Sequence, residues 1–165
     1  MFKHVHPDYV AHRVTDVQPE ELLELGISGV ILDLDNTLTL WNSDEVTPEV
    51  RAWVDQVRAA GLQACVVSNA VTTLRVCVVA DALGIPWVTR ALKPLPFGFR
   101  RGMRLMRTTP ATTAVIGDQM FTDIWGGNRL GLFTILVDPI SPHEAFFTRL
   151  IQRSLERLVG RDRRE

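Results

Sequence analysis

Three short polar stretches follow apolar runs of this chain and combine residue types that could do chemistry together. The first stretch, residues 33–37, reads Asp-Leu-Asp-Asn-Thr, and the second is Ser68-Asn69. The third, residues 117–123, reads Gly-Asp-Gln-Met-Phe-Thr-Asp. Lys93, one of the two lysines in an otherwise arginine-based set of cations, lies in the segment between the second and third stretches.

These residue types favour a divalent cation and phosphoryl transfer. Carboxylates that share one site repel each other, so they stay ionised together only when a cation joins them. A site built from oxygen ligands suits Mg²⁺. A carboxylate such as Asp33 can attack phosphorus, while Lys93 and the Ser68 hydroxyl neutralise the phosphoryl oxygens. Asp35 is placed to protonate the leaving oxygen and then to activate water.

The segments that must position these residues alternate between strands and helices. Apolar runs and helix start and stop residues predict strands at 29–33, 62–67, 87–89, 113–116 and 133–137, with helices at 19–25, 48–60, 72–83, 96–107, 122–130 and about 143–159. Residues 1–16 are expected to be irregular. This alternation is typical of a parallel sheet with helices on both faces. Because ligands bind at the carboxyl ends of such strands, the polar stretches should converge there.

In this order, the polar stretches resemble the four motifs of haloacid dehalogenase superfamily phosphatases. The matches are Asp33-Leu-Asp35-Asn-Thr37 for the opening DxDxT motif, Ser68 for the second, Lys93-Pro94 for the third, and Gly117-Asp118 with Thr122-Asp123 for the fourth. The resemblance covers about residues 29–137. It implies a three-layer, Rossmann-like α/β fold with a five-stranded, mainly parallel sheet in the order 3-2-1-4-5.

The resemblance also implies a role for each matching residue. Asp33 would be the nucleophile and a metal ligand, and Asp35 would be the general acid/base. The main-chain carbonyl of Asp35 and the carboxylate of Asp118 would complete the protein ligands of Mg²⁺. The other residues would bind phosphate (Ser68, Asn69 and Lys93) or support the site (Thr37 in the turn after the nucleophile, Asp123 beside the metal and Lys93).

The spacing of the motifs leaves no room for the cap domain that many members of this family carry. About a dozen residues separate Asp35 from the helix near Thr47, and about two dozen lie between Lys93 and Asp118. An open site goes with large substrates in this family. The chain most resembles the capless class III A, YqeG-like branch, whose eukaryotic relatives act on phosphatidylglycerophosphate. A phospholipid at a membrane surface is therefore a candidate substrate by resemblance.

The end of the chain predicts a basic amphipathic helix over about residues 143–159. Its apolar residues share one face, and arginines lie beside or beyond that face: Phe146, Phe147, Leu150, Ile151, Leu155, Leu158 and Val159, with Arg149, Arg153, Arg157, Arg161, Arg163 and Arg164. Such a helix can lie on an anionic membrane or pack against its own domain, and packing is the favoured interpretation. We expect a cytoplasmic protein, with a peripheral position at the inner face of the membrane as the alternative.

Composition narrows the class of protein further. A chain of 165 residues suits one domain, here residues 1–165 with a core at 29–137. The formal net charge of −1 gives no reason to expect a nucleic-acid partner, and no protein partner is indicated. Cys65 and Cys77 lack metal-site spacing and are expected to be reduced thiols. We find no secretory signal and no apolar stretch near the ~20 residues of a membrane span.

Two other functions compete with a phosphatase. A phospho-accepting receiver domain also combines a parallel sheet, clustered acids and a lysine, but its lysine comes last, whereas Lys93 precedes Asp118. A catalytically silent scaffold of the same fold is disfavoured, because unpaired buried carboxylates would lower stability with no compensating gain.

Several features also have purely structural explanations. Residues 33–44 are a poor calcium loop, since Leu38 and Asp44 stand where glycine and glutamate are needed. Trp41 is expected to belong to the core or the cleft wall rather than to contact substrate. The arginines of 100–107 are expected to form a solvated helix face, with attraction of an anionic substrate as the alternative.

Overall fold

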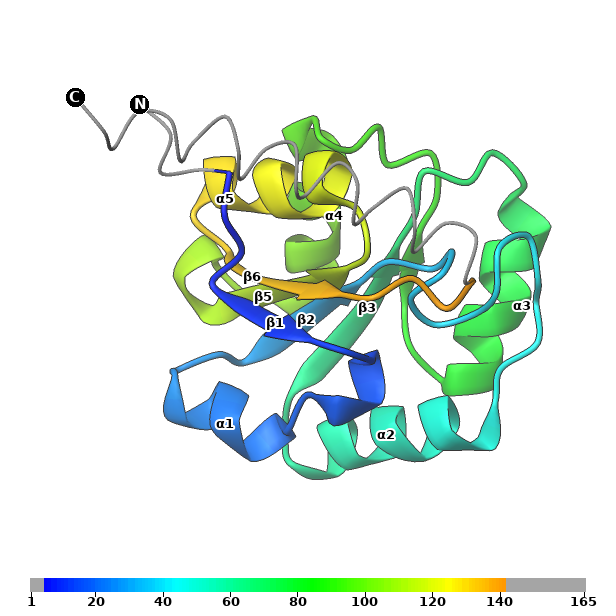
Figure 1. Ribbon diagram of the computed structural model, residues 1–165, viewed down its shortest axis with the longest axis horizontal. Helices are drawn as coiled ribbons and strands as arrows, with labels where there is room; N and C mark the ends of the chain where they lie inside the picture. Colours follow the sequence, from blue (N-terminus) through cyan, green and yellow to red (C-terminus); the bar gives the residue numbers. More distant parts are fainter. Residues whose placement is uncertain (1–4, 142–165) are drawn as a thin grey trace, which may run out of the picture.

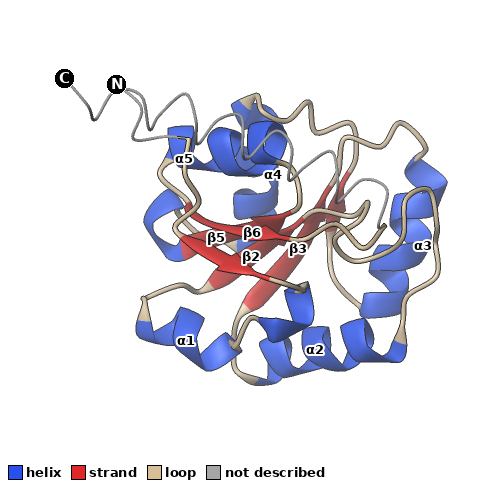
Figure 2. Ribbon diagram, in the orientation of Figure 1, coloured by secondary structure: helices blue, strands red, loops and turns tan. Residues whose placement is uncertain are grey.

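The computed structural model describes residues 5–141, which form one six-stranded sheet whose strands are all parallel (Figures 1 and 2). The strand order is β1-β6-β5-β2-β3-β4. The bounds are β1 Tyr9–Ala11, β2 Gly29–Leu32, β3 Gln63–Val67, β4 Trp87–Val88, β5 Thr113–Gly117 and β6 Phe133–Val137. The α/β class and the order expected for the five predicted strands are confirmed, and β1 adds a sixth strand beside β6.

Helices cover both faces of the sheet and give it three layers (Figure 2). One face carries α1 (Pro19–Glu24), α2 (Pro48–Ala59) and α3 (Thr73–Leu83), and the other carries α4 (Pro96–Met106) and α5 (Gly126–Leu130). The central strand β2 serves both layers, because Val30 and Leu32 pack toward the first set and Ile31 toward the second. This explains why the strand reads as a continuous apolar run.

Local sequence signals set the ends of the helices. The Thr47 hydroxyl accepts a hydrogen bond from the Val50 N–H at 3.3 Å, and Pro48 occupies the first helical position of α2. Gly84 ends α3 with a φ of 65°, a left-handed conformation that glycine adopts without steric cost. The loop before α2 starts at the carboxyl end of β2, and the loop before α3 starts at the carboxyl end of β3.

One prediction of local structure was wrong, and one predicted helix is present but is not an α-helix throughout. Residues 9–11 form β1 instead of irregular chain; this strand is a Tyr-Val-Ala run of only three residues, two of them exposed, which is too short to predict a buried strand. The segment predicted as one helix over 122–130 is a six-residue π-helix, η3 (Met120–Trp125), followed by α5. The predicted helix at 143–159 lies outside the described residues. Within residues 5–141, no helix has the length and apolar character that crossing a membrane would require.

A close approach at Gly98 ties α4 to the loop after β4. A Cβ atom at position 98 would lie 2.7 Å from the carbonyl oxygen of Ala91 and closer still to the Ala91 side chain. Only glycine lets the helix pack this tightly against residues 91–95. The contact matters for the site, because Lys93 belongs to that loop.

We therefore predict that Gly98→Ala lowers the free energy of unfolding by about 1–3 kcal/mol, the usual cost of inserting an atom into a packed contact. Urea unfolding followed by circular dichroism measures the change. Arg100→Ala, on the exposed side of the same helix, is the control and should shift stability by less than about 0.5 kcal/mol. Equal stability of Gly98→Ala and the parent chain would contradict the packing argument.

Candidate active site

The predicted site residues lie at the carboxyl edge of the sheet. Asp33 directly follows β2, Ser68 follows β3, and Asp118 follows β5. β2 pairs with β3 on one side and β5 on the other, so the chain leaves the sheet centre in two directions at this point. Such a switch point is where open α/β sheets bind ligands.

Lys93 joins two of the carboxylates. Its Nζ donates a hydrogen bond to Asp33 Oδ1 at 2.6 Å and another to Asp123 Oδ1 at 2.6 Å. All three side chains are buried. Burial alone would lower the pKa of Lys93, but the charges of Asp123 and Asp33 outweigh it and hold the pKa above its ordinary value. Lys93 is therefore a permanent cation at the centre of the site.

A group of three buried carboxylates surrounds this lysine. Oxygens of Asp33, Asp118 and Asp123 lie within 4.8 Å of one another. Burial, opposed by Lys93 and reinforced by Asp123, raises the pKa of Asp33 to about 7. Burial together with the charges of Asp33 and Asp123 raises the pKa of Asp118 to about 8. Lys93 contacts only Asp33 and Asp123, so its single charge does not offset the repulsion among all three acids.

The donor set fits a hard divalent cation. Asp118 Oδ1 is buried and has no hydrogen-bond partner among residues 5–141, which is costly for a carboxylate oxygen unless a ligand satisfies it. Carboxylate oxygens at this spacing are the ligands that Mg²⁺ prefers. Asp123, expected to support the metal shell, brings its carboxylate into the same group as Asp33 and Asp118.

The geometry of η3 and Gly117 holds Asp123 in this position. The main-chain N–H of Gln119 donates to Asp123 Oδ2 at 3.2 Å. A Cβ atom on Gly117 would lie 2.7 Å from the Cβ of Asp123 and would overlap its carboxylate. Glycine is therefore required at position 117 on steric grounds, because this residue must leave room for Asp123, six positions later.

The side chain of Asp35 is held by an arginine that the sequence analysis missed. Arg75, in the first turn of α3, donates from Nη1 to Asp35 Oδ1 at 2.7 Å and from Nη2 to Oδ2 at 2.8 Å. Nη1 also donates to the Ser43 carbonyl at 3.2 Å, and the Asn42 N–H donates to Asp35 Oδ1 at 3.1 Å. An available signal was the position of Arg75 itself, because a cation in the first turn of a helix opposes the helix dipole unless an anion pairs with it.

Ser68 and Asn69 lie against the loop that carries Lys93. The Ser68 hydroxyl is buried and accepts the Ala70 N–H at 3.0 Å. The Asn69 side chain accepts the Lys93 N–H at 2.7 Å and donates to the Lys93 carbonyl at 2.9 Å. The amide of Asn69 therefore fixes the main chain of Lys93, and its predicted contact with phosphate stays a prediction.

The turn after Asp33 is closed and buried. Thr37 and Leu38 donate their N–H groups to the Leu34 carbonyl at 3.4 and 3.0 Å. Thr37 is 2% exposed, and its hydroxyl has no hydrogen-bond partner in the described part of the chain. A hollow of about 730 Å³ lies beside this turn, and its lining includes Thr37, Leu40, His12 and Ile140. Neither Asp33 nor Asp118 lines it.

Comparison with known families and structures agrees with this arrangement. The family model described as haloacid dehalogenase-like hydrolase matches residues 6–131. Among solved structures, an uncharacterized protein from Listeria monocytogenes serotype 4b matches with a TM-score of 0.57 and 20% identity, covering 67% of this chain and 78% of that one. A subfamily III A hydrolase of this superfamily from Legionella pneumophila matches with a TM-score of 0.50 and 19% identity, covering 81% and 78%. These two likenesses support the fold.

Curated relatives carry the comparison further. The probable phosphatase YqeG of Bacillus subtilis is 38% identical over 93% of this chain and 88% of its own length. The chloroplastic/mitochondrial phosphatidylglycerophosphate phosphatase 1 of Arabidopsis thaliana is 29% identical over 81% of this chain, which spans only 41% of that protein. The match over 6–131, the YqeG likeness and the shared fold lead to one conclusion. The chain belongs to the haloacid dehalogenase-like hydrolases and is a phosphatase of that family.

Proposed function

We propose that this phosphatase is a Mg²⁺-dependent phosphomonoester hydrolase that works through an aspartyl-phosphate on Asp33. The observation that carries the proposal is the group of three buried carboxylates within 4.8 Å, two of them joined by Lys93. Asp33 and Asp118 would be carboxylate ligands of the ion, with the main-chain carbonyl of Asp35 as a third. When bound, Mg²⁺ supplies positive charge to the phosphoryl oxygens and lowers their repulsion of the nucleophile.

The remaining steps belong to the side chains. Asp33 attacks phosphorus, forming a bond from its carboxylate oxygen while the bond to the leaving oxygen breaks. Asp35 gives its proton to the leaving oxygen, then takes a proton from the water that attacks the aspartyl-phosphate. This second step regenerates Asp33 and releases inorganic phosphate. Lys93 and the Ser68 hydroxyl hold the phosphoryl oxygens throughout, so the charge that develops meets fixed donors.

Arg75 holds the Asp35 side chain in one position for both of these steps. Two hydrogen bonds from one guanidinium fix both the position and the plane of the carboxylate. Asp35 must release one of them to carry a proton, and the second would keep the group close to the site. We therefore assign Arg75 as a positioning residue that acts through Asp35.

The proposed substrate is a large phosphomonoester, with phosphatidylglycerophosphate as the lead. Support comes from the two algal and plant relatives named phosphatidylglycerophosphate phosphatase 1, although the chain covers only 41% and 59% of them. Support also comes from the short connections at this edge, where β2 is followed by about fifteen residues before α2. A cytoplasmic protein bound peripherally to the inner face of the membrane would have such a substrate within reach.

The first prediction concerns the nucleophile. Hydrolysis of p-nitrophenyl phosphate should require Mg²⁺ and should fall by at least about 10³-fold in Asp33→Asn, because the amide cannot form the acyl phosphate. Release of p-nitrophenol measures the rate, and Asp55→Asn on the exposed face of α2 is the matched control. Stable phosphoprotein without turnover would indicate a receiver-like domain, and no reaction in the parent chain would indicate a silent scaffold.

The second prediction concerns the metal and pH. Asp118 has a raised pKa of about 8, so its protonated form stabilises the metal-free fold at low pH and that contribution is lost as the pH rises through about 8. The melting temperature of metal-free protein should therefore fall between about pH 6 and about pH 9. Excess Mg²⁺ should raise it more at the higher pH, where protons no longer compete for the carboxylates.

Asp118→Asn is the variant that checks this reasoning by differential scanning fluorimetry. It should lose most of the Mg²⁺-induced rise and show a smaller fall with pH. An unchanged response to Mg²⁺ in Asp118→Asn would place the ion elsewhere.

The third prediction concerns Arg75. In Arg75→Ala, kcat for p-nitrophenyl phosphate should fall by about 10- to 100-fold while KM changes little, because a misplaced acid/base slows the chemical steps and leaves phosphate binding intact. Arg75→Lys should recover part of kcat, since a lysine keeps one hydrogen bond and loses the paired geometry. The exposed Arg101→Ala is the control. A rise in KM with unchanged kcat would mean that Arg75 binds substrate directly.

A further inference from the structure

The most exposed large apolar side chains of the described residues gather at the edge that carries the site. Six of them define what we call the apolar rim: Trp41 (60% exposed), Val71 (70%), Leu74 (72%), Leu92 (60%), Phe97 (64%) and Phe121 (63%). Among residues 5–141, Val10 on the edge strand β1 is the other large apolar side chain that reaches 60%. Exposed apolar residues are normal singly, but a concentration of them marks an interaction surface.

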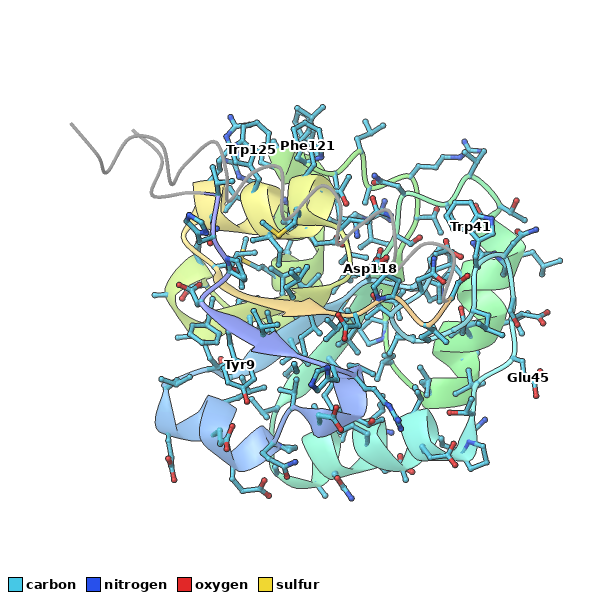
Figure 3. The ribbon with its side chains drawn as sticks, in the orientation of Figure 1. Tyr9, Trp41, Glu45, Asp118, Phe121 and Trp125 are labelled. Atoms are coloured by element: carbon cyan, nitrogen blue, oxygen red, sulfur yellow. The ribbon has the colours of Figure 1, made fainter. Side chains whose placement is uncertain are left out.

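The members of the rim come from four separate connections, all at the end of the sheet where the carboxylates lie. Trp41 follows β2, Val71 and Leu74 follow β3, Leu92 and Phe97 follow β4, and Phe121 follows β5. In Figure 3, Asp118 lies between Trp41 on one side and Phe121 with Trp125 on the other. The connections after β3 and β4 are tied together, since Ala91 donates its N–H to the Ser68 carbonyl at 3.0 Å and Arg90 to the Ala70 carbonyl at 3.3 Å.

At two places on this edge, apolar side chains are exposed to water at a cost in free energy. Leu92 is 60% exposed and also has a φ of 57°, a left-handed conformation that bulky residues seldom adopt. Phe121 stacks on Trp125 with ring centroids 5.0 Å apart, and this pair stays at the surface although one ring is 63% exposed. Unfavourable features of this kind persist next to functional sites.

Cations accompany the rim. Arg90 is exposed and its main-chain N–H bonds the carbonyl of Ala70, the residue before Val71, and the guanidinium of Arg129 lies 4.6 Å from the Trp125 ring centre. Exposed Asp44 and Glu45 lie in the connection after Trp41, toward α2. β6 ends at this same edge, and the sequence of residues 142–165, outside the described part of the chain, contains six arginines against four acids. Aromatic rings, leucines and arginines in one band suit the boundary of an anionic bilayer.

We propose that the apolar rim docks this edge of the protein on an anionic lipid bilayer, so that a phosphomonoester headgroup enters the site directly from the membrane surface. This inference rests on the proposed phosphatase function and specifies where the substrate comes from. The rim side chains enter the boundary between headgroups and acyl chains, and Arg90 and Arg129 meet the lipid phosphates. Asp33 and Lys93 then face the plane of the headgroups, and a substrate need not leave the bilayer.

The test uses the full chain and vesicles of phosphatidylcholine with or without phosphatidylglycerol. The parent chain should sediment with the anionic vesicles, and Trp41→Ser/Leu74→Ser/Phe97→Ser should bind them at least about tenfold more weakly, since three apolar contacts are lost. Leu23→Ser/Leu25→Ser is the matched control, because these exposed leucines lie at the end of α1 (Leu23) and directly after it (Leu25), before β2 and away from the site. Its vesicle binding should equal that of the parent chain.

Activity separates this inference from the proposed function. The rim variant should hydrolyse p-nitrophenyl phosphate at the parental rate and lose at least about tenfold of its rate on phosphatidylglycerophosphate in vesicles, because only the second substrate requires docking. If the parent chain hydrolyses neither, the proposed function fails; if it hydrolyses both and the rim variant matches it on vesicles, the docking inference alone fails. Parental vesicle binding in the rim variant, or a rim that instead forms a dimer in sizing chromatography, would also overturn it.

Discussion

The site depends on one buried cation held between buried anions. Lys93 without its partners would be an isolated charge in the interior, and Asp33, Asp118 and Asp123 without a cation would repel one another, so each half is costly alone. Together they leave an excess of negative charge and an unsatisfied oxygen on Asp118. This imbalance makes the edge a place for a divalent ion and a phosphoryl group, instead of a neutral ion pair that only stabilises the fold.

Much of the surrounding fold serves to keep Lys93 in reach of both carboxylates. Gly98 lets α4 press against Ala91, Asn69 holds the Lys93 main chain through two hydrogen bonds, and Gly117 leaves room for Asp123. Each of these contacts joins one part of the protein to another. They convert connections after three different strands into one unit, which is what preorganisation of a charged site requires, because a loose lysine would choose one carboxylate and leave the other unpaired.

The sequence predicted those elements of the fold that leave a local or periodic pattern of apolar residues. Buried parallel strands read as apolar runs, so β2, β3, β5 and β6 and the residues at their ends could be placed, and their family resemblance supplied the order of the sheet. The apolar run of β1 has only three residues, too few to mark a strand, and η3 follows a π-helical pattern that ordinary helix signals do not distinguish. The Arg75–Asp35 pair joins residues forty positions apart, which only the packing of α3 against the β2 connection creates.

Buried charges inside this edge and exposed apolar side chains around it together have a consequence for catalysis. Buried charges interact strongly only where water is excluded, and many enzymes of this family exclude it with a cap domain that the short connections here cannot supply. An apolar border that seals against a bilayer would do the same work, because the headgroup layer would displace water from Asp33 and Lys93 as the substrate enters. On this view Trp41, Leu92 and Phe121 are exposed for the same reason that Lys93 is buried: the site is completed by the surface that presents its substrate.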